Sequence, residues 1–404
     1  MKVLLVSQYF WPESFLITSI VSRLVQEGHE VDVLTGKPNY PQGVIYQGYR
    51  AWGCSSELHG GALIHRVPLA PRGRGGLRLA LNYLSFILSG MVFGPFLLRG
   101  RRADVIFVYA PSPLLQAFPA ILLGRIKRCP VVVWVQDLWP QSLSATGHVR
   151  NKTALWLVEK AVRFIYRHSK LLLVQSEAFV QPVSRLAPAT DISYLPNSVS
   201  DSFAADQAKA GGTSGGFTVL FAGNLGSAQA VDCILLAAEQ LRGHPDIGFS
   251  LVGDGSRRQY LLEEVARRRL ANVALPGRFP VEAMPQMMQQ ASVLLVTLSA
   301  QEIFEYTVPS KVQAYMAAGR PIIAAINGEG ARIVREAGVG IAVPAEDGQA
   351  LAQAILRMRD MPASKREAFG AAGRAYYMAH YREEILLGRL LEHLGRVAID
   401  GKEN

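Results

Sequence analysis

Short runs rich in valine, isoleucine and leucine alternate with longer amphipathic stretches along the chain, and they do so in two separate series. The first series includes KVLLV, EVDVLT, DVIFVYA, PVVVWVQ and KLLLVQS, and the second includes FTVLFAG, GFSLVG, SVLLVTL and RPIIAAI. Buried strands that alternate with helices predict a parallel sheet whose two faces are covered by helices. The sequence therefore predicts an α/β protein with two successive doubly wound, Rossmann-like units.

The boundaries between these units follow from changes in composition. Residues 1–200 carry the first series, and the small and polar residues of 201–216 indicate an interdomain linker. The second series occupies residues 217–377. Only helical periodicity remains after it, so we expect a C-terminal helix over about 378–404 that crosses back onto the first unit.

Charge is distributed unevenly over the 404 residues, which have a formal net charge of +10. Residues 1–200 hold 21 Lys and Arg against 10 Asp and Glu, whereas residues 201–404 hold 21 against 22. This asymmetry favours an anionic partner for the first half, either a nucleic acid or an acidic membrane surface. The composition does not choose between the two.

The three cysteines, Cys54, Cys129 and Cys233, lie far apart, and neither a CxxC pair nor an HExxH sequence occurs. A disulfide framework and a zinc cluster are therefore not supported, and a reducing cytoplasm is the expected compartment. The N-terminal run MKVLLVSQYFWPES has too few apolar residues for a signal peptide and predicts a buried strand.

Three strand-to-helix turns of the second unit carry pairs of glycines. The pairs are Gly223 with Gly226, Gly253 with Gly255, and Gly328 with Gly330. Glycine lets the backbone approach a ligand, and N–H groups at a helix start favour phosphate, although such glycines often serve the turn alone. Because ligands of open parallel sheets lie outside the carboxyl ends of the strands, the turns predict an anion site there. No GxxxxGK[ST] is present, which argues against a P-loop hydrolase, and no DxD is present to hold a metal-bound diphosphate.

The segment VPSKVQAYMAAGRPIIAA, residues 308–325, predicts a helix that starts near Pro309 and ends at Gly319. Lys311 falls in the first turn of this helix, where the helix dipole favours acids over bases. An anion bound in front of the helix would account for this lysine, and a solvated surface lysine is the alternative.

Seven segments follow one another in a specific order: SQYFWPE, GHEVDVLTGKPNYPQGVIYQGY, VQDLWPQS, LPNSV, FAGNLGSAQAVD, VGDGSRR and VPSKVQAYMAAGRPIIA. In this order they resemble the bacterial GT-B glycosyltransferases of the retaining family four, especially the colanic acid and O-antigen subgroup that includes L-fucosaminyltransferases. The resemblance implies a GT-B fold that binds a nucleotide-diphosphate sugar on the C-terminal domain and an acceptor on the N-terminal domain. It also implies transfer with retention at the anomeric carbon and no cofactor beyond the substrate.

The chain departs from that family at the glycine loop, where Asn224 and Gln229 replace an Arg and a Lys that often hold the diphosphate. It departs again at Tyr306 and Ala314, where two glutamates are usual. The contacts to the donor must therefore come from other residues.

Lys311, Arg278 and the backbone amides of 223–226 are expected to bind the diphosphate, and the remaining acids are expected to meet donor hydroxyls. The complete set of expected donor-binding residues is Gly223, Asn224, Gly226, Gly253, Asp254, Gly255, Arg278, Glu302, Glu305, Lys311, Glu329 and Gly330. The expected catalytic residues are Glu13, Asp137 and Lys311, the first two of which would orient the acceptor hydroxyl. Fixed positive donors would stabilise the leaving diphosphate without a metal ion.

Residues Leu79–Leu98 are apolar over a length that would span about 30 Å as a helix. The arginines that flank this run, all expected to contact a membrane, are Arg72, Arg74, Arg78, Arg99, Arg101 and Arg102. Positive charge on both sides argues against a single crossing and favours a helix lying in an anionic interface. A re-entrant segment, a buried helix with a solvated arginine rim and a true span remain open.

These features together predict a peripheral glycosyltransferase on the cytoplasmic face of the inner membrane. Its expected donor is a UDP-linked N-acetylated amino or deoxy sugar such as L-FucNAc, and its expected acceptor is a polyprenyl-diphosphate-linked saccharide of O-antigen, capsule or exopolysaccharide assembly. A nucleotide-sugar 2-epimerase of the same fold is the enzyme alternative, although its soluble substrate needs no basic apolar surface. A nucleic-acid-binding protein is the other alternative, although no helix-turn-helix, zinc finger or RNP motif occurs.

Overall fold

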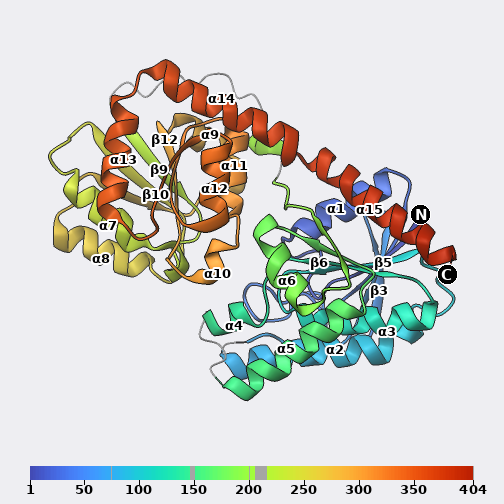
Figure 1. The fold of residues 1–404 in the computed structure, drawn as a ribbon. Helices are drawn as coiled ribbons and strands as arrows, with labels where there is room; N and C mark the ends of the chain where they lie inside the picture. Colours follow the sequence, from blue (N-terminus) through green and yellow to red (C-terminus); the bar gives the residue numbers. More distant parts are fainter. Residues whose placement is uncertain (74, 146–150, 200, 205–215, 404) are drawn as a thin grey trace. The chain divides into compact units, whose positions relative to one another are not determined.

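The computed structural model describes the chain apart from residues 74, 146–150, 200, 205–215 and 404, and it divides into two compact units (Figure 1). The first unit consists of Met1–Pro196 together with Leu387–Asn404, and the second consists of Asn197–Leu386. Each unit is a mainly parallel sheet between layers of helices. The predicted fold, two doubly wound α/β domains with a C-terminal helix that returns to the first, is confirmed.

An eight-stranded sheet forms the first unit. Its strands are β1 (Lys2–Val6), β2 (Glu30–Thr35), β3 (Ser55–His59), β4 (Ala62–Arg66), β5 (Val105–Ala110), β6 (Val131–Val135), β7 (Leu171–Val174) and β8 (Asp191–Tyr194). They are arranged in the order β3-β4-β2-β1-β5-β6-β7-β8, and β3 is the antiparallel strand at one edge. Val3 of the central strand β1 lies opposite Val31 of β2 and Val105 of β5.

Helices cover both faces of this sheet. They are α1 (Leu16–Gln26), α2 (Gly76–Leu97), α3 (Phe118–Lys127), α4 (Gln141–Ala145), α5 (Lys152–Arg167), α6 (Val180–Leu186) and α15 (Glu383–Glu403), with the 3₁₀ turns η1 (Leu114–Ala117) and η2 (Glu177–Phe179). Figure 1 shows α2, α3 and α5 on one side of the sheet and α1 and α15 on the other. Because both faces are covered, every residue of β5 and β6 is buried.

Helix α2 packs in parallel against α3 through two glycines. A Cβ at Gly90 would lie 2.7 Å from Cγ of Pro119. One turn further along both helices, a Cβ at Gly94 would lie 3.6 Å from Cδ1 of Leu123. The small residues on this side let the two helices approach closely, so the inner side of α2 belongs to the protein core.

Asn82, on the same inner side of α2, is fully buried and joins a polar network. Its amide oxygen accepts a hydrogen bond from Nε2 of Gln8 at 2.7 Å, and its amide nitrogen donates to the carbonyl oxygen of Ala70 at 2.7 Å. By length and composition α2 could cross a membrane. Its inner side, however, is committed to the first unit, so the interpretation of 79–98 as a free-standing span is not supported by these contacts.

A six-stranded parallel sheet forms the second unit. Its strands are β9 (Phe217–Ala222), β10 (Ile247–Val252), β11 (Val273–Gly277), β12 (Val293–Thr297), β13 (Ile322–Ala325) and β14 (Gly340–Val343). They are arranged in the order β11-β10-β9-β12-β13-β14. The direction of strand addition reverses between β9 and β12, and ligands of open α/β sheets bind outside the carboxyl ends of the strands at such a reversal.

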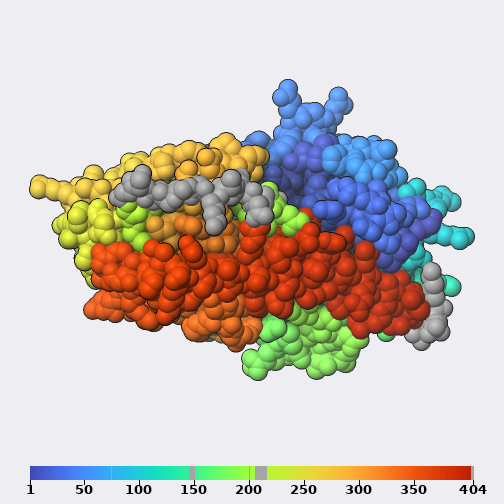
Figure 2. Space-filling model, turned by 90° about the horizontal axis from the view of Figure 1, so that it is seen from above, coloured from blue at the N-terminus to red at the C-terminus, as the bar shows by residue number. Residues whose placement is uncertain are grey.

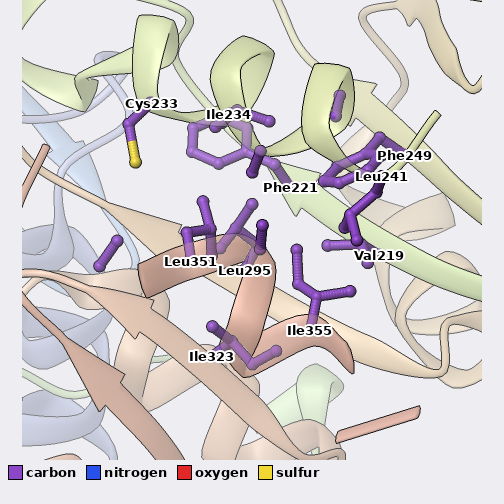
Figure 3. Close-up of a cluster of buried hydrophobic side chains, with 14 of the residues drawn as sticks. Val219, Phe221, Cys233, Ile234, Leu241, Phe249, Leu295, Ile323, Leu351 and Ile355 are labelled. Carbon is purple, nitrogen blue, oxygen red and sulfur yellow. The ribbon is translucent and has the colours of Figure 1, made fainter. Parts of the chain in front are cut away.

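The helices of the second unit pack on this sheet through a large apolar core. They are α7 (Val231–Gln240), α8 (Arg258–Arg268), α9 (Met284–Gln290), α10 (Glu302–Glu305), α11 (Ser310–Ala318), α12 (Gly328–Glu336), α13 (Gly348–Asp360) and α14 (Ala363–His380), with the 3₁₀ turns η3 (Asp201–Phe203), η4 (Ser227–Gln229) and η5 (Val281–Ala283). Figure 3 shows Ile234 of α7 and Leu351 of α13 close to Phe221 and Leu295 of the strands. All four side chains are fully buried, which holds the strand ends in place.

The C-terminal helices α14 and α15, red in Figure 2, are exposed at the molecular surface. Helix α14 lies close to α11 of the second unit, where a Cβ at Gly370 would lie 2.1 Å from the carbonyl oxygen of Gly319. In α15, Leu390, Leu394 and Val397 are buried within the first unit. The last helix therefore supplies core residues to the first unit.

Candidate functional site

Two glycine loops of the second unit lie in direct backbone contact at the carboxyl ends of β9 and β10. A Cβ at Gly253 would lie 1.8 Å from the carbonyl oxygen of Gly223, and one at Gly255 would lie 2.5 Å from that of Leu225. The φ angle is 141° at Gly253 and 156° at Gly255. Glycine is therefore required at both positions because one loop backbone packs on the other.

The backbone N–H groups of 223–226, which the sequence predicts to bind a diphosphate, are mostly used inside the protein. Those of Gly223, Leu225 and Gly226 donate to oxygens of the same two loops or of the strand ends, at 2.8–3.2 Å. The Asn224 N–H is the one of the four without an acceptor among the described residues. One amide, rather than four, therefore remains for a phosphate, because the loops use the others to hold each other.

Lys311 lies in the first turn of α11, and its side chain reaches the loop after β9. Its Nζ lies 3.6 Å from the ring centroid of Phe221 and would be 3.1 Å from a Cβ at Gly223. This Nζ is buried and has no hydrogen-bond partner among the described residues. Burial lowers the pKa of Lys311 to about 7. An unpaired buried ammonium is costly unless an anion joins it, so a phosphate group fits at this point.

A cavity of about 350 Å³ opens beside these loops. Its lining residues are Gly223, Asn224, Val252, Gly253, Asp254, Arg278, Phe279, Val281 and Met284. Five of the predicted donor-binding residues therefore meet in one cavity, and Lys311 lies against the same loop. The apolar wall made by Phe279, Val281 and Met284 is not predicted from the sequence, in which the apolar residues within and after GRFP are its only signal.

The acids predicted to meet donor hydroxyls do not line this cavity. Glu329 is buried in the first turn of α12, where its carboxylate pairs with Arg332 at 2.5 Å. Glu302 accepts a hydrogen bond from the Tyr306 hydroxyl at 3.0 Å, and Glu305 is exposed on α10. These three carboxylates therefore lie outside the cavity, on the helices α10 and α12 that follow β12 and β13.

The predicted glycines Gly226, Gly255 and Gly330 also lie outside the cavity lining. A Cβ at Gly330 would lie 2.8 Å from Cδ1 of Ile326 and 3.1 Å from Cδ of Pro309. Close packing of the loops, rather than an approach to this cavity, accounts for glycine at these positions.

In the first unit, Glu13 joins the loops that follow β1 and β2. Its carboxylate accepts hydrogen bonds from the backbone N–H groups of Asn39 and Tyr40 at 2.7 Å each and from that of Phe10 at 3.2 Å. Burial raises the pKa of Glu13 against the opposing effect of these hydrogen bonds. These hydrogen bonds make Glu13 a positioning residue for the two loops, and its predicted contact with the acceptor stays a prediction.

Asp137 follows β6 in the loop that also carries Trp139, and Ser142 lies just beyond it in α4. Burial raises the pKa of Asp137, and hydrogen bonds from the Ser142 and Trp139 side chains oppose that shift. The carboxylate is half-buried at the carboxyl end of the sheet. Asp137 therefore stays the predicted acceptor contact of the first unit.

Two of the arginines predicted to contact a membrane are engaged inside the first unit. Arg101 donates to both carboxylate oxygens of Asp32 at 2.9 and 2.6 Å, and these bonds raise the pKa of Arg101. The Arg72 guanidinium lies over a tyrosine at the carboxyl end of the sheet, with Cζ 5.3 Å from the ring centroid of Tyr40. These contacts give Arg101 and Arg72 roles inside the first unit, and their predicted contact with a membrane stays a prediction.

Arg78, Arg99 and Arg102 are exposed near the two ends of α2, and Arg74 lies outside the described residues. Between them, the side of α2 that faces away from α3 is apolar, and we call it the α2 outer face. Its exposed large apolar side chains are Leu77, Leu81, Leu84, Leu88, Val92, Phe93 and Phe96, with Trp156 and Leu157 of α5 exposed on the same side of the sheet. An exposed apolar surface of this extent marks an interaction site.

Two family descriptions match the chain, one in each unit. Residues 16–198 match the glycosyl transferase 4-like domain, and residues 216–360 match glycosyl transferases group 1. A protein of Escherichia coli (strain K12) described as "Putative colanic acid biosynthesis glycosyl transferase WcaI" is 24% identical over 346 residues, which is 79% of this chain and 82% of that protein.

Solved structures share the fold over nearly the whole chain. Sucrose-phosphate synthase from Thermosynechococcus elongatus has a TM-score of 0.74 at 17% identity and covers 98% of this chain and 99% of its own. Anabaena Alr3699/HepE in complex with UDP has a TM-score of 0.71 at 15% identity and covers 98% of this chain and 100% of its own. Residues 16–198 therefore belong to the glycosyl transferase 4-like domain family and residues 216–360 to the glycosyl transferases group 1 family, which makes this chain a glycosyltransferase with the GT-B fold.

Proposed function

We propose that this protein transfers a sugar from a UDP-linked donor to a saccharide carried on a polyprenyl diphosphate. The observation that carries the donor half is the Lys311 ammonium, which is buried without a described partner against the Gly223 loop. A diphosphate at that loop would pair with the ammonium, and the apolar wall of Phe279 and Val281 would receive the base. The UDP bound to the similar Anabaena protein supports a uracil nucleotide.

The chemistry requires positive groups around the leaving diphosphate. As the bond from the anomeric carbon to the diphosphate oxygen breaks, positive charge builds on the sugar and negative charge on the diphosphate. Lys311, Arg278 and the Asn224 N–H stand where they can stabilise that negative charge without a metal ion. With retention, the acceptor oxygen attacks from the face that the diphosphate leaves, and the departing phosphate takes the acceptor proton.

The transferred sugar that we propose is an N-acetylated amino or deoxy sugar such as L-FucNAc, added during O-antigen, capsule or exopolysaccharide assembly. The order of the seven sequence segments supports this subgroup, and so does the similarity to a protein described as a colanic acid biosynthesis transferase. The lipid-linked acceptor is proposed on the same ground.

A lipid-linked acceptor places the enzyme at the cytoplasmic face of the inner membrane, and the α2 outer face supports this location. Leu77 is 78% exposed near one end of α2, and Phe96 is 73% exposed near the other. Arg99 and Arg102 follow the helix and suit an anionic lipid surface. Because the inner side of α2 packs on α3, we propose that the helix lies in the interface rather than across it.

Calorimetric titration of the full chain with UDP and with uridine tests the donor site. Lys311→Met should weaken UDP binding about tenfold or more and leave uridine binding nearly unchanged, since the lost contact is to phosphate. Lys365→Met, at an exposed lysine of α14, is the matched control and should bind both ligands as the wild type does. Equal losses for UDP and uridine would show that Lys311 does not contact phosphate.

A transfer assay then tests the reaction. UDP-sugars are incubated with a short-chain prenyl-diphosphate saccharide in the presence of EDTA, and the anomeric configuration of the product is read by NMR. We expect transfer with retention and no loss in EDTA. A loss that Mg²⁺ reverses would contradict metal independence, an inverted product would contradict retention, and an epimerised donor without transfer would favour the 2-epimerase.

A further inference from the structure

Arg72 lies in the first unit among tyrosines from three distant segments. Its Cζ is 5.3 Å from the ring centroid of Tyr40, and the Tyr40 and Tyr9 rings are 5.6 Å apart. Burial raises the pKa of Tyr9 and of Tyr83, and the nearby Arg72 charge opposes that shift in both. The Arg72 guanidinium thus lies near the buried Tyr9 side chain and the partly buried Tyr83 side chain, and over the Tyr40 ring.

The Arg72 guanidinium has no carboxylate partner among the described residues, in contrast to Arg101, which is paired with Asp32. Two carboxylates lie near these tyrosines, since the Glu13 charge raises the pKa of Tyr9 and the Asp137 charge raises that of Tyr83. The Glu13 oxygens accept backbone hydrogen bonds. The Tyr9 residue is 2% exposed, and its hydroxyl lies beside the Arg72 side chain and the Tyr83 hydroxyl but makes no hydrogen bond of normal geometry to the described residues. A cation and a buried hydroxyl, both without a full complement of partners, indicate a site for an anion.

Backbone contacts fix Arg72 in this position. Its N–H donates to Oδ1 of Asn39 at 3.0 Å, and Asn39 accepts a second hydrogen bond from Asn82 of α2 at 3.3 Å. The next residue, Gly73, donates its N–H to the carbonyl oxygen of Gly43 at 2.9 Å. The guanidinium is therefore carried by a segment that is tied at several points, which lowers the entropy lost when a ligand binds.

We propose that Arg72, with the Tyr9 and Tyr83 hydroxyls, forms a phosphate subsite for the acceptor on the first unit. A guanidinium presents paired N–H donors that match phosphate oxygens, and the hydroxyls supply further donors. The ligand class is a phosphate ester, and its identification as the diphosphate of the acceptor rests on the proposed function. Arg72 precedes Gly76, the first residue of α2, by four positions, so the subsite lies next in sequence to the proposed lipid surface.

Calorimetry with geranyl diphosphate, a water-soluble prenyl diphosphate, tests the subsite on the full chain. Arg72→Gln should weaken geranyl diphosphate binding about tenfold or more and leave UDP binding unchanged. Arg72→Lys should recover part of the loss, because it keeps the charge but not the paired donors. Arg50→Gln, at an exposed arginine of the same unit, is the control and should bind both ligands as the wild type does.

Tyr9→Phe removes only a hydroxyl, so it provides a second test of the subsite if the arginine variants unfold. It should weaken geranyl diphosphate about threefold without changing UDP affinity. Unchanged geranyl diphosphate binding in Arg72→Gln, or equal losses of geranyl diphosphate and UDP, would overturn the subsite. If the wild type binds inorganic phosphate as tightly as geranyl diphosphate, the assignment of the ligand as a lipid-linked diphosphate is overturned. A wrong proposed function has a different signature, since the wild type would then fail to bind UDP while geranyl diphosphate binding still depended on Arg72.

Discussion

The two units carry the same architecture at the carboxyl edges of their sheets, but they hold their loops by different means. In the second unit the loop backbones rest directly on one another, as Gly253 does on Gly223. In the first unit the loops are joined by side chains, as Glu13 joins the loops after β1 and β2. Close backbone contacts require glycine, which can be recognised in a sequence. Hydrogen bonds between side chains and distant loops leave no such local pattern, so the sequence does not indicate which residues are partners.

The largest effect is expected when the backbone contact of the second unit is broken by Gly253→Ala. The new Cβ would lie 1.8 Å from the carbonyl oxygen of Gly223, so the two loops must separate. We expect the free energy of unfolding to fall by about 3 kcal/mol or more and UDP binding to disappear. Gly248→Ala in β10 is the control, because its Cβ would meet nothing within 4 Å. Equal urea-unfolding curves for the two variants would show that the backbone contact between the loops does not stabilise the second unit.

The next effect is expected in the first unit, where Asn82→Ala breaks a side-chain bridge. Asn82 is fully buried, and its loss leaves Nε2 of Gln8 and the carbonyl oxygen of Ala70 without their partner. We expect the free energy of unfolding in urea to fall by about 2 kcal/mol. Leu81→Ala, at the exposed neighbouring position, should cost much less. Similar losses in both variants would mean that the bridge does not hold the loops.

An effect of opposite sign is expected from Lys311→Met. Burial lowers the pKa of Lys311 from 10.5 to about 7, so between these values the folded chain binds fewer protons than the unfolded chain. The free energy of unfolding of the wild type therefore rises with pH across that window. Below pH 7 the buried ammonium is charged, and it lowers the stability by its full amount. We expect Lys311→Met to be more stable than the wild type at low pH, with the gain shrinking toward pH 10.5 by up to about 1.4 kcal/mol for each unit of the pKa difference.

Thermal unfolding of both proteins across this pH range measures the difference. A gain that does not change with pH would show that Lys311 is not the titrating group. The same titration predicts that wild-type UDP affinity falls as the pH rises above 7, because the ammonium loses its proton.

The smallest effect concerns the α2 outer face, which has no described counterpart in the second unit. Each arginine near an anionic surface contributes about 1 kcal/mol, so Arg99→Gln combined with Arg102→Gln should lower affinity for anionic vesicles about thirtyfold. Arg101→Gln should leave vesicle binding unchanged, because Arg101 is paired with Asp32. Co-sedimentation measures both variants. An equal loss of vesicle binding in Arg101→Gln would contradict the distinction between the exposed arginines and the paired Arg101. If the wild type binds DNA as strongly as it binds anionic vesicles, a nucleic acid is favoured over lipid as the partner.

The strands of both sheets could be predicted from the sequence, because each buried strand is a local run of apolar residues. The sequence also singled out Lys311, since a base in the first turn of a helix opposes the helix dipole, and the structure brings that ammonium to the glycine loop. In the first unit, fewer of the side-chain contacts could be predicted from the sequence. Arg101 and Asp32 are 69 residues apart, and no periodicity links them.

Arg72 shows the same limit more sharply. In the sequence it is one of several arginines around an apolar run, which led to a membrane assignment. Its surroundings come from Tyr9, Tyr40 and Tyr83, which become neighbours only when the loops after β1 and β2 meet helix α2. The apolar residues at 279, 281 and 284 were missed for a related reason, because a wall of a cavity and a core side chain look alike in a sequence.

Helix α15 gives the chain a nested order. The second unit, 197–386, is an uninterrupted insertion, whereas the first unit needs both the start of the chain and 387–404. On the ribosome the inserted unit is therefore complete before the unit that surrounds it. The buried residues Leu390, Leu394 and Val397 arrive last and close the earlier core. A chain stopped just short of them would release a finished second unit attached to an unfinished first one.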